Sequence, residues 1–276
     1  PIPGLSDVPD ILTNMNMFEI EKMPESLAII GGGAIGSEMA QAFSRLGTKV
    51  SLAHMDPHLV PAGDEEAGRL LEEVFAGEGI EVRNGAKITS VSVKDGRIVT
   101  VTDKGTLTSE RILVAAGRKP VIGPLHLDRA GIVFSKKGIT VDSRMRTSRP
   151  HIYAVGDCNG HSLLSHAAMH QGMLALMDAM SPVPMGVLKR ERYVVPWAVF
   201  TQPEIAQVGM TEKEAREKGL KFQVVKKDFR SYGRTVADGR PEGFIKVITG
   251  PRGKIYGAAI VGEAASELIH EWTMAI

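Results

Sequence analysis

Residues 27–38 constrain the fold of this chain more than any other stretch. Residues 27–30 are apolar, three glycines follow them directly, and a fourth glycine comes three positions later. Downstream, apolar residues recur at the spacing of one helix face. The pattern predicts a buried strand, a tight turn and a helix, with Gly31, Gly33 and Gly36 at the glycine positions of the G-x-G-x-x-G motif.

Each glycine of this motif has a physical role in a dinucleotide-binding fold. The first turns the chain, the second lets the backbone approach a pyrophosphate, and the third packs the helix against the strand. The helix N-terminus then offers N–H groups and partial positive charge to the phosphates. The alternative is a glycine-rich connection that binds nothing, but the apolar strand before the motif and the amphipathic helix after it favour a nucleotide site.

The end of the next strand, predicted over 49–53, selects the nucleotide in such folds. An acid there favours NAD, and a nearby arginine favours NADP. His54 occupies this position and leaves three interpretations open. Protonated, it would pair with a 2′-phosphate; neutral, it would bond a ribose hydroxyl; or it is an exposed loop residue. Asp56 is a second residue within reach of the ribose.

Strand and helix patterns continue beyond this βαβ unit. A helix is expected over 65–76 and an antiparallel three-stranded meander over 88–108. The apolar strand that starts at Arg111 ends at Gly117, which brings backbone to the carboxyl edge of the sheet, where ligands bind.

A second strand-to-helix step is expected farther along the chain. The apolar segment 150–155 predicts a strand that ends in Gly156 and Asp157, with a helix over 162–180 behind it. An aspartate at such an edge accepts hydrogen bonds from sugar-like hydroxyls, and the glycine permits close approach. The methionines of the helix indicate core or interface packing.

An α+β unit is expected after a linker over 181–192. Thr211 opens a short helix with a capping box. The strands of this unit are expected at 193–200, 222–228, 243–249 and 255–261. The last helix, from 264, has no stop signal, and the chain lacks an initiator methionine, so both ends are expected to be cut.

Composition excludes several classes of function. The 276 residues carry a net charge of +1, which gives no reason to expect nucleic acid or a membrane surface as a partner. The single cysteine allows no internal disulfide and favours a cytoplasmic location. His166 and His170 have an i, i+4 spacing that suits zinc, but no third ligand is in view, so no metal site is predicted.

Four motifs together resemble a known family. They are 31–38 (GGGAIGSE), 115–120 (AAGRKP), 153–157 (YAVGD) and 199–209 (VFTQPEIAQVG). In this order they are similar to those of the pyridine nucleotide–disulfide oxidoreductases, class I flavoproteins whose members include dihydrolipoyl dehydrogenase and mercuric reductase.

The resemblance implies an α/β fold with a divided FAD domain. A Rossmann-like NAD(P)-binding domain with a three-stranded β-meander is inserted in a partial FAD-binding domain, and a partial α+β dimerisation domain follows. The implied segments are 1–22 for the end of the first FAD segment, 23–120 for NAD(P), 121–188 for the second FAD segment and 189–276 for dimerisation.

The resemblance also implies an activity and its cofactors. The parent protein is expected to be a homodimer that transfers hydride between NAD or NADP and FAD, with a disulfide or another small molecule as substrate. Around NAD(P) it implies contacts from Gly31, Gly32, Gly33, Ala34, Ile35, Gly36, Glu38, His54, Ile88, Gly117 and Arg118. Around FAD it implies contacts from Gly156, Asp157, Leu163, Leu164, Ser165 and His166, where a helix N-terminus would stabilise negative charge on the flavin.

Other parts of the family pattern are missing from this chain. The first FAD glycine motif and the redox cysteine pair would precede residue 1, and the catalytic histidine and glutamate would follow residue 276. No catalytic residue is therefore predicted here, and the chain alone is expected to be inactive. Cys158 is expected to be a small buried residue. Two alternatives stay open: an NAD(P)-binding module without catalysis, and a structural fragment that binds nothing.

Overall fold

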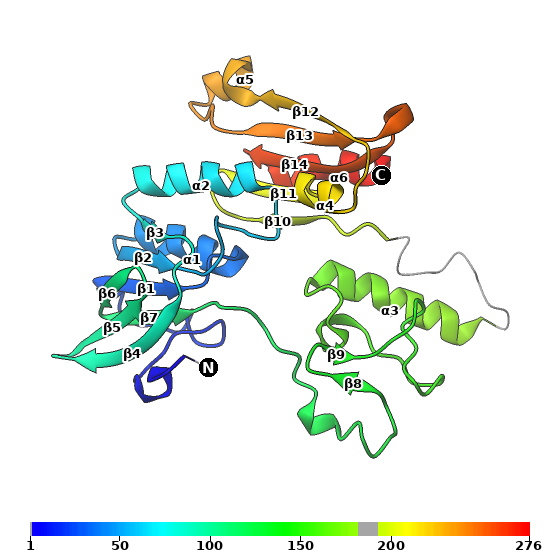
Figure 1. The fold of residues 1–276 in the computed structure, drawn as a ribbon, viewed down its shortest axis with the longest axis horizontal. Helices are drawn as coiled ribbons and strands as arrows, with labels where there is room; N and C mark the ends of the chain where they lie inside the picture. The colour runs from blue at the N-terminus through cyan, green and yellow to red at the C-terminus, as the bar shows by residue number, and fades with distance from the viewer. Residues whose placement is uncertain (1, 182–192) are drawn as a thin grey trace. The chain divides into compact units, whose positions relative to one another are not determined.

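The computed structural model describes residues 2–181 and 193–276 and divides the chain into two compact units (Figure 1). The first unit runs to Gly117 and resumes at Pro196, and the second unit runs from Arg118 to Val195. The domain boundary expected at 188/189 and most of the linker expected over 181–192 lie outside the described residues.

A parallel sheet carries the glycine loop in the first unit. Its strand order is β3-β2-β1-β7, and all three pairings are parallel. The last residue of β1, Ile30, is in register with Ala53 and Val114, so the three strands end at one edge. The predicted strand–turn–helix–strand unit is confirmed. The elements are β1 (Ser26–Ile30), α1 (Ala34–Arg45), β2 (Lys49–Ala53), α2 (Glu65–Gly77), β3 (Glu81–Arg83) and β7 (Arg111–Val114).

The predicted meander also forms, as a three-stranded antiparallel sheet in the order β4-β5-β6. Its strands are β4 (Ile88–Lys94), β5 (Arg97–Thr102) and β6 (Gly105–Ser109). A short 3-10 helix, Leu5–Asp7, precedes the parallel sheet.

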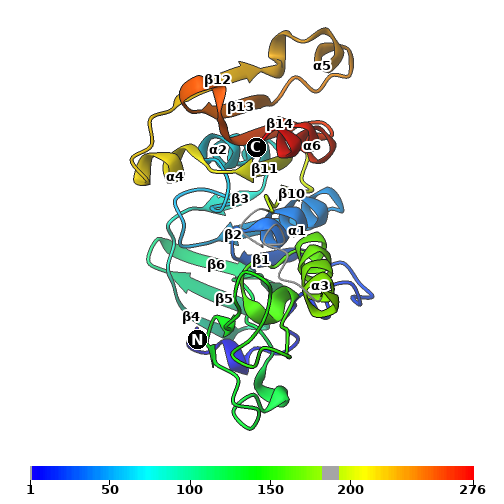
Figure 2. The same cartoon turned by 90° about the vertical axis from the view of Figure 1, so that its right-hand side faces the viewer.

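The C-terminal part of the first unit is a five-stranded antiparallel sheet in the order β10-β11-β14-β13-β12. Its last two strands in the sequence follow the predicted segments closely, and the capping box at Thr211 is present. Figure 2 shows α2 beside this sheet. The elements are β10 (Trp197–Val199), β11 (Glu204–Gly209), α4 (Glu212–Glu217), β12 (Gln223–Asp228), α5 (Gly233–Ala237), β13 (Phe244–Thr249), β14 (Ile255–Gly262) and α6 (Ala265–Ala275).

One hydrophobic core joins the parallel and antiparallel sheets of this unit. Leu27 of β1 and Leu71 of α2 belong to the same buried cluster as Val199, Phe244 and Val261 of the antiparallel sheet. Burial of each such side chain contributes about 1.5–3 kcal/mol. The parallel-sheet half and the antiparallel sheet are therefore packed as one body.

One local prediction in the antiparallel part was wrong, and two elements, β11 and α5, were not predicted. The strand expected over 193–200 is confined to 197–199, since Pro196 has no N–H to donate to a ladder. The short helix α5, Gly233–Ala237, was not expected, because its few residues show no apolar periodicity.

The second unit is mostly loop around one long helix. Its elements are β8 (Phe134–Ser135), β9 (Gly138–Ile139), α3 (Ser165–Met180) and two 3-10 helices at Gly123–Leu125 and Gly156–Asn159. The buried carboxylate of Asp178 on α3 accepts hydrogen bonds from Arg146 Nε at 2.5 Å and Tyr153 Oη at 2.9 Å. These bonds attach the C-terminal half of the helix to the preceding loops.

Three predictions in this unit were wrong. The strand over 150–155 does not form: Tyr153 makes a single bridge to Arg146, and no described strand lies where a ladder could extend it. The helix starts at Ser165 instead of 162, because Leu164 is extended. For the methionines of the helix, the core alternative is wrong and the interface alternative stays a prediction, since these side chains are exposed: Met169, Met173, Met177 and Met180.

No helix in the described ranges is long and apolar enough to cross a bilayer.

Candidate functional site

The first and third glycines of the loop are required by the packing of the protein itself. Gly31 has φ +116°, and a Cβ on it would lie 2.5 Å from the carbonyl oxygen of Ala115. A Cβ on Gly36 would lie 1.9 Å from the carbonyl oxygen of Gly31. These two positions therefore hold β1, α1 and the segment after β7 in close contact.

Gly33 lies in a different environment. A Cβ on Gly33 would meet no heavy atom within 4 Å, although this residue is the N-cap of α1. The first hydrogen bond there runs from Ser37 N to Gly33 O at 2.9 Å, so the preceding amides point out of the helix end. A Cβ would thus lie in open space beside these amides, so no packing constraint within the protein accounts for glycine here. Helix N-termini with such amides are typical sites for phosphate groups.

The loop after β2 is fastened to the glycine loop at two points. The backbone N–H of Val60 donates to the carbonyl oxygen of Gly32 at 2.7 Å. The imidazole of His54 lies against the same glycine, since a Cβ on Gly32 would come within 2.7 Å of the ring. Val60 is buried at φ +50°, a strained conformation for a β-branched residue. The surrounding contacts therefore hold this residue in place.

His54 is buried, so the interpretation as an exposed loop histidine was wrong. Only 3% of the residue is exposed. Its Nε2 lies 2.7 Å from Asn84 Oδ1, and its buried Nδ1 has no hydrogen-bond partner among the described residues. Asp56 Oδ2 is 3.8 Å from Nδ1. The ring thus has a carboxylate and an amide oxygen on its two sides.

Apart from Arg118, the other residues expected around the nucleotide lie near this loop or on α1. Ala86 N donates to His54 O at 2.7 Å, which places Ile88 just beyond the end of β2. Gly117 has φ +104°, and a Cβ added to it would meet no heavy atom within 4 Å. Glu38 has a structural contact that the sequence did not reveal: its Oε1 accepts a hydrogen bond from Phe200 N at 2.9 Å. This bond connects α1 to the antiparallel part.

The residues expected around the flavin lie in the second unit. Asp157 is exposed, and its Oδ2 lies 3.3 Å from Arg118 Nη1. The same nitrogen donates to the carbonyl oxygen of Leu163 at 3.2 Å. Arg118, expected beside NAD(P), therefore contacts the expected flavin segment. Ser165 and His166 are exposed in the first turn of α3, and Leu164 is the N-cap.

Gln171 is a residue of this segment that sequence reasoning missed. Its Oε1 accepts hydrogen bonds from Gly156 N at 2.8 Å and Asn159 Nδ2 at 2.7 Å. It holds the turn that presents Asp157. The neighbouring Cys158 is half-buried, and burial raises the pKa of its thiol.

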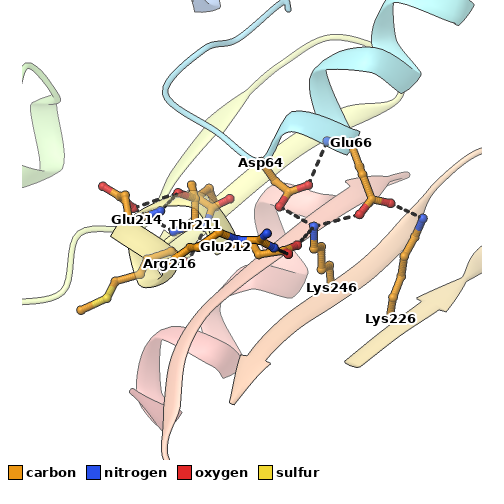
Figure 3. Close-up of polar contacts among 10 residues, drawn as sticks. Asp64, Glu66, Thr211, Glu212, Glu214, Arg216, Lys226 and Lys246 are labelled. Carbon is orange, nitrogen blue, oxygen red and sulfur yellow. Dashed lines mark hydrogen bonds and ion pairs between the residues drawn. The ribbon is translucent and has the colours of Figure 1, made fainter. Parts of the chain in front are cut away.

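A buried charge cluster in the first unit was also missed (Figure 3). Lys246 Nζ on β13 lies 2.9 Å from Asp64 Oδ2, 2.8 Å from Glu66 Oε1 and 2.8 Å from Glu212 Oε2. Asp64 also caps α2 by accepting from Glu66 N at 3.0 Å. Burial lowers the pKa of Lys246, but hydrogen bonds to the three carboxylates outweigh it and raise the pKa well above its ordinary value. The cluster therefore joins the parallel-sheet half to the antiparallel sheet.

The charge cluster makes the stability of the folded protein depend on pH in the acidic range. In the folded protein, hydrogen bonds to Lys246 lower the pKa of Glu212 and, with Lys226, that of Glu66, despite the raising effect of burial. The contribution of these two carboxylates to stability is present above their unfolded pKa of about 4.3. It is lost as the pH falls through their pKa values in the folded protein. The Lys246 pKa is raised, so titration of Lys246 itself removes stability only on the alkaline side, as the pH rises above its unfolded pKa of about 10.4 towards the folded value. Urea unfolding across this acid range should show a shallower fall in stability for Glu212→Gln than for wild type, and equal slopes would contradict it.

The parallel sheet and the glycine loop have the architecture of the dinucleotide-binding α/β folds. Residues 1–172 match the family "Pyridine nucleotide-disulphide oxidoreductase", and residues 195–276 match its dimerisation domain. The chain belongs to the pyridine nucleotide-disulphide oxidoreductase family.

Two relatives of known sequence are both named dihydrolipoyl dehydrogenase. The chain is 37% identical to a dihydrolipoyl dehydrogenase of Thermus scotoductus, with 100% of this chain and 61% of that protein covered. It is 36% identical to the dihydrolipoyl dehydrogenase of Bacillus subtilis, with 94% and 56% covered. The chain thus spans about 60% of the length of these relatives.

Solved structures of the same kind match the fold. The Cu(II) complex of RclA, an HOCl-induced flavoprotein disulfide reductase from Escherichia coli, gives a TM-score of 0.90 at 26% identity, covering 99% of this chain and 62% of that one. LpdA from Mycobacterium tuberculosis gives a TM-score of 0.84 at 30% identity, covering 96% and 57%. The α/β fold expected from the sequence is confirmed.

Proposed function

We propose that the protein carrying this chain is an FAD-dependent NAD(P)H oxidoreductase similar to dihydrolipoyl dehydrogenase. It transfers hydride between nicotinamide and flavin and exchanges electrons with a disulfide, a dithiol or another small acceptor. Family membership and the names of the relatives support this assignment. The observation that carries it is the open space at Gly33 beside the N-terminus of α1, which a pyrophosphate fits.

In this proposal the glycine loop binds the nicotinamide nucleotide. The amides at Gly33, Ala34 and Ile35 would contact the pyrophosphate, while Gly31 and Gly36 hold the turn that presents them. The segments after β2 and β7 lie next to this loop through Gly32 and Gly31 respectively. They would surround the adenosine and the nicotinamide side of the ligand.

The second unit would contribute the flavin contacts of this chain. The exposed carboxylate of Asp157 is suited to accept hydrogen bonds from the hydroxyls of a polyol chain, and Gly156 beside it has φ +76°. The N-terminus of α3, with Ser165 and His166, would face negative charge on the flavin. When bound, FAD supplies the capacity to accept and return hydride.

The assembly and location of the protein are part of the same proposal. The match of residues 195–276 to a dimerisation domain supports a homodimer. The single cysteine supports a cytoplasmic location. The balanced charge supports small-molecule or disulfide substrates rather than nucleic acid or a membrane surface.

Gly33→Ala tests the site directly. The added methyl group meets no protein atom, so the melting temperature should stay unchanged, but it occupies the space assigned to the phosphate. The NADH concentration that half-reduces the bound FAD, followed by flavin absorbance, is expected to rise about tenfold or more, equivalent to about 1.4 kcal/mol.

Gly77→Ala is the matched control, because a Cβ there also meets open space and the residue lies at the far end of α2. It should leave the NADH dependence unchanged. A Gly33→Ala protein that is reduced like wild type would disprove the phosphate assignment, and a purified protein that never binds FAD would disprove the oxidoreductase.

A further inference from the structure

We propose that Lys246 is a positioning residue for nucleotide binding and acts on the glycine loop through the carboxylate of Asp64. This role rests on the proposed nucleotide-binding function. It adds a contribution from the antiparallel sheet, which lies in the part of the chain that matches the dimerisation domain. Lys246 itself touches no nucleotide in this proposal. It fixes the far end of the loop over 54–64, whose middle is hydrogen-bonded to Gly32.

The loop over 54–64 holds the glycine loop at one point near its middle. Val60 N donates to Gly32 O at 2.7 Å, and Val60 is buried with a φ of +50°. A β-branched residue keeps this conformation only where its surroundings hold it. Gly32 directly precedes Gly33, the N-cap of α1, so a displacement of Val60 is passed to the amides at the start of the helix. The position of those amides decides how well they meet a phosphate.

The far end of the same loop is held by the antiparallel sheet. Asp64 Oδ2 lies 2.9 Å from Lys246 Nζ, and both side chains are buried. The preceding residue, Gly63, lies against the ring of Trp197 on β10, since a Cβ added to it would come within 2.9 Å of that ring. Gly63 N also donates to Val60 O at 2.9 Å. A short path of contacts and peptide bonds therefore connects β13 to the glycine loop.

Hydrogen bonds fix the direction of the Lys246 ammonium. It carries three N–H donors, and three carboxylates lie within 2.9 Å of Nζ, those of Asp64, Glu66 and Glu212. The Asp64 carboxylate is held from a second side, because its Oδ1 accepts from Glu66 N at 3.0 Å as the N-cap of α2. A helix cap alone needs an acceptor and no buried cation. The ammonium is therefore the group that ties this cap to β13.

The three carboxylates differ in what they are attached to. Asp64 ends the loop, whereas Glu66 lies in the first turn of α2 and Glu212 lies on α4 of the antiparallel part. Side chains along a packed network between two places can modulate affinity without touching the ligand. Neutralising Asp64 should therefore weaken nucleotide binding, whereas neutralising Glu212 should not, although each change removes one carboxylate from the same ammonium.

Calorimetric titrations of the purified protein with NAD⁺ and with NADP⁺ test this role, because the oxidised nucleotides do not reduce the flavin. Asp64→Asn keeps a capping side chain and should raise the dissociation constant of the more tightly bound nucleotide about threefold to tenfold. Glu212→Gln is the matched control and should leave this constant unchanged. An unchanged constant in Asp64→Asn, or equal losses in the two variants, would overturn the inference.

Hydrogen exchange of the Val60 amide reports on the loop without any nucleotide. This amide is bonded to Gly32, so its exchange should be faster in Asp64→Asn than in wild type and unchanged in Glu212→Gln. Equal exchange in all three proteins would show that Asp64 does not hold the glycine loop. Failure of wild type to bind either nucleotide would instead count against the proposed function, and the exchange of Val60 would still decide whether the connection exists.

Ile98→Ala separates positioning from a general loss of stability. Ile98 is buried on β5, in a hydrophobic cluster to which no residue of the loop over 54–64 belongs. Its truncation should lower the urea midpoint and leave the dissociation constant of the folded protein unchanged. If Asp64 had a purely structural role, Asp64→Asn would behave in the same way, with a lower midpoint and wild-type affinity.

Discussion

Lys246→Met is expected to lower the free energy of unfolding of the first unit by about 3–5 kcal/mol. The Lys246 ammonium and the Asp64 carboxylate are 4% and 3% exposed, and methionine fills the space without supplying a charge. The replacement leaves the Asp64 carboxylate buried beside two further carboxylates with no ammonium between them. Removal of one partner of a buried ion pair costs far more than the pair itself contributes, because the remaining charge is desolvated. Urea unfolding followed by circular dichroism gives the difference.

Two further variants separate burial from simple charge loss. Lys226 also pairs with Glu66, at 2.6 Å, but its side chain is 35% exposed. Lys226→Met should therefore cost about 1 kcal/mol or less. Adding Asp64→Asn to Lys246→Met should recover part of the loss, since asparagine is neutral and still caps a helix. Equal losses for the two lysine variants would show that Lys246 behaves as a surface residue.

Gly36→Ala is expected to destabilise the same unit by about 3 kcal/mol or more. The new Cβ would lie 1.9 Å from the carbonyl oxygen of Gly31, which belongs to the backbone and cannot rotate away. Helix α1 would have to move off β1, even though alanine is the better helix former by up to about 1 kcal/mol. Chemical denaturation measures this effect without any ligand.

Comparison with Gly33→Ala separates the effect on stability from the effect on nucleotide binding. Both changes add one methyl group to the same loop, but only Gly36 faces protein backbone. Gly36→Ala should lose stability, and Gly33→Ala should lose only nucleotide affinity. A Gly36→Ala protein as stable as wild type would mean that α1 and β1 do not approach as closely as described.

Local sequence patterns predicted the parts of the fold that local interactions determine. The strand before Gly31, the helix after it and the meander over 88–108 each combine a periodic apolar pattern with turn residues, and all of them form. The segment 150–155 has an equally apolar pattern but no described partner strand, so it stays irregular. A strand pattern is realised only where a neighbour supplies the ladder.

The candidate site was predicted less completely than the fold. The glycines of the motif can be recognised in the sequence by their type and spacing. The burial of His54, in contrast, depends on Gly32 and Asn84, which become neighbours of His54 only in the folded chain. The Lys246 cluster draws its acids from α2 and α4. One indication was available in the sequence: Lys246 stands two residues after Phe244 and two before Ile248, on the buried face of its strand.

The shared core of the first unit also bears on how the protein is synthesised. Leu27 and Leu71 leave the ribosome early, whereas Phe244 and Val261, which complete their cluster, emerge only after the whole second unit. During that interval the apolar surface that awaits them is open to solvent and to other nascent chains. We therefore expect the nascent chain to need chaperones most at the stage before its last strands, β13 and β14, have been synthesised.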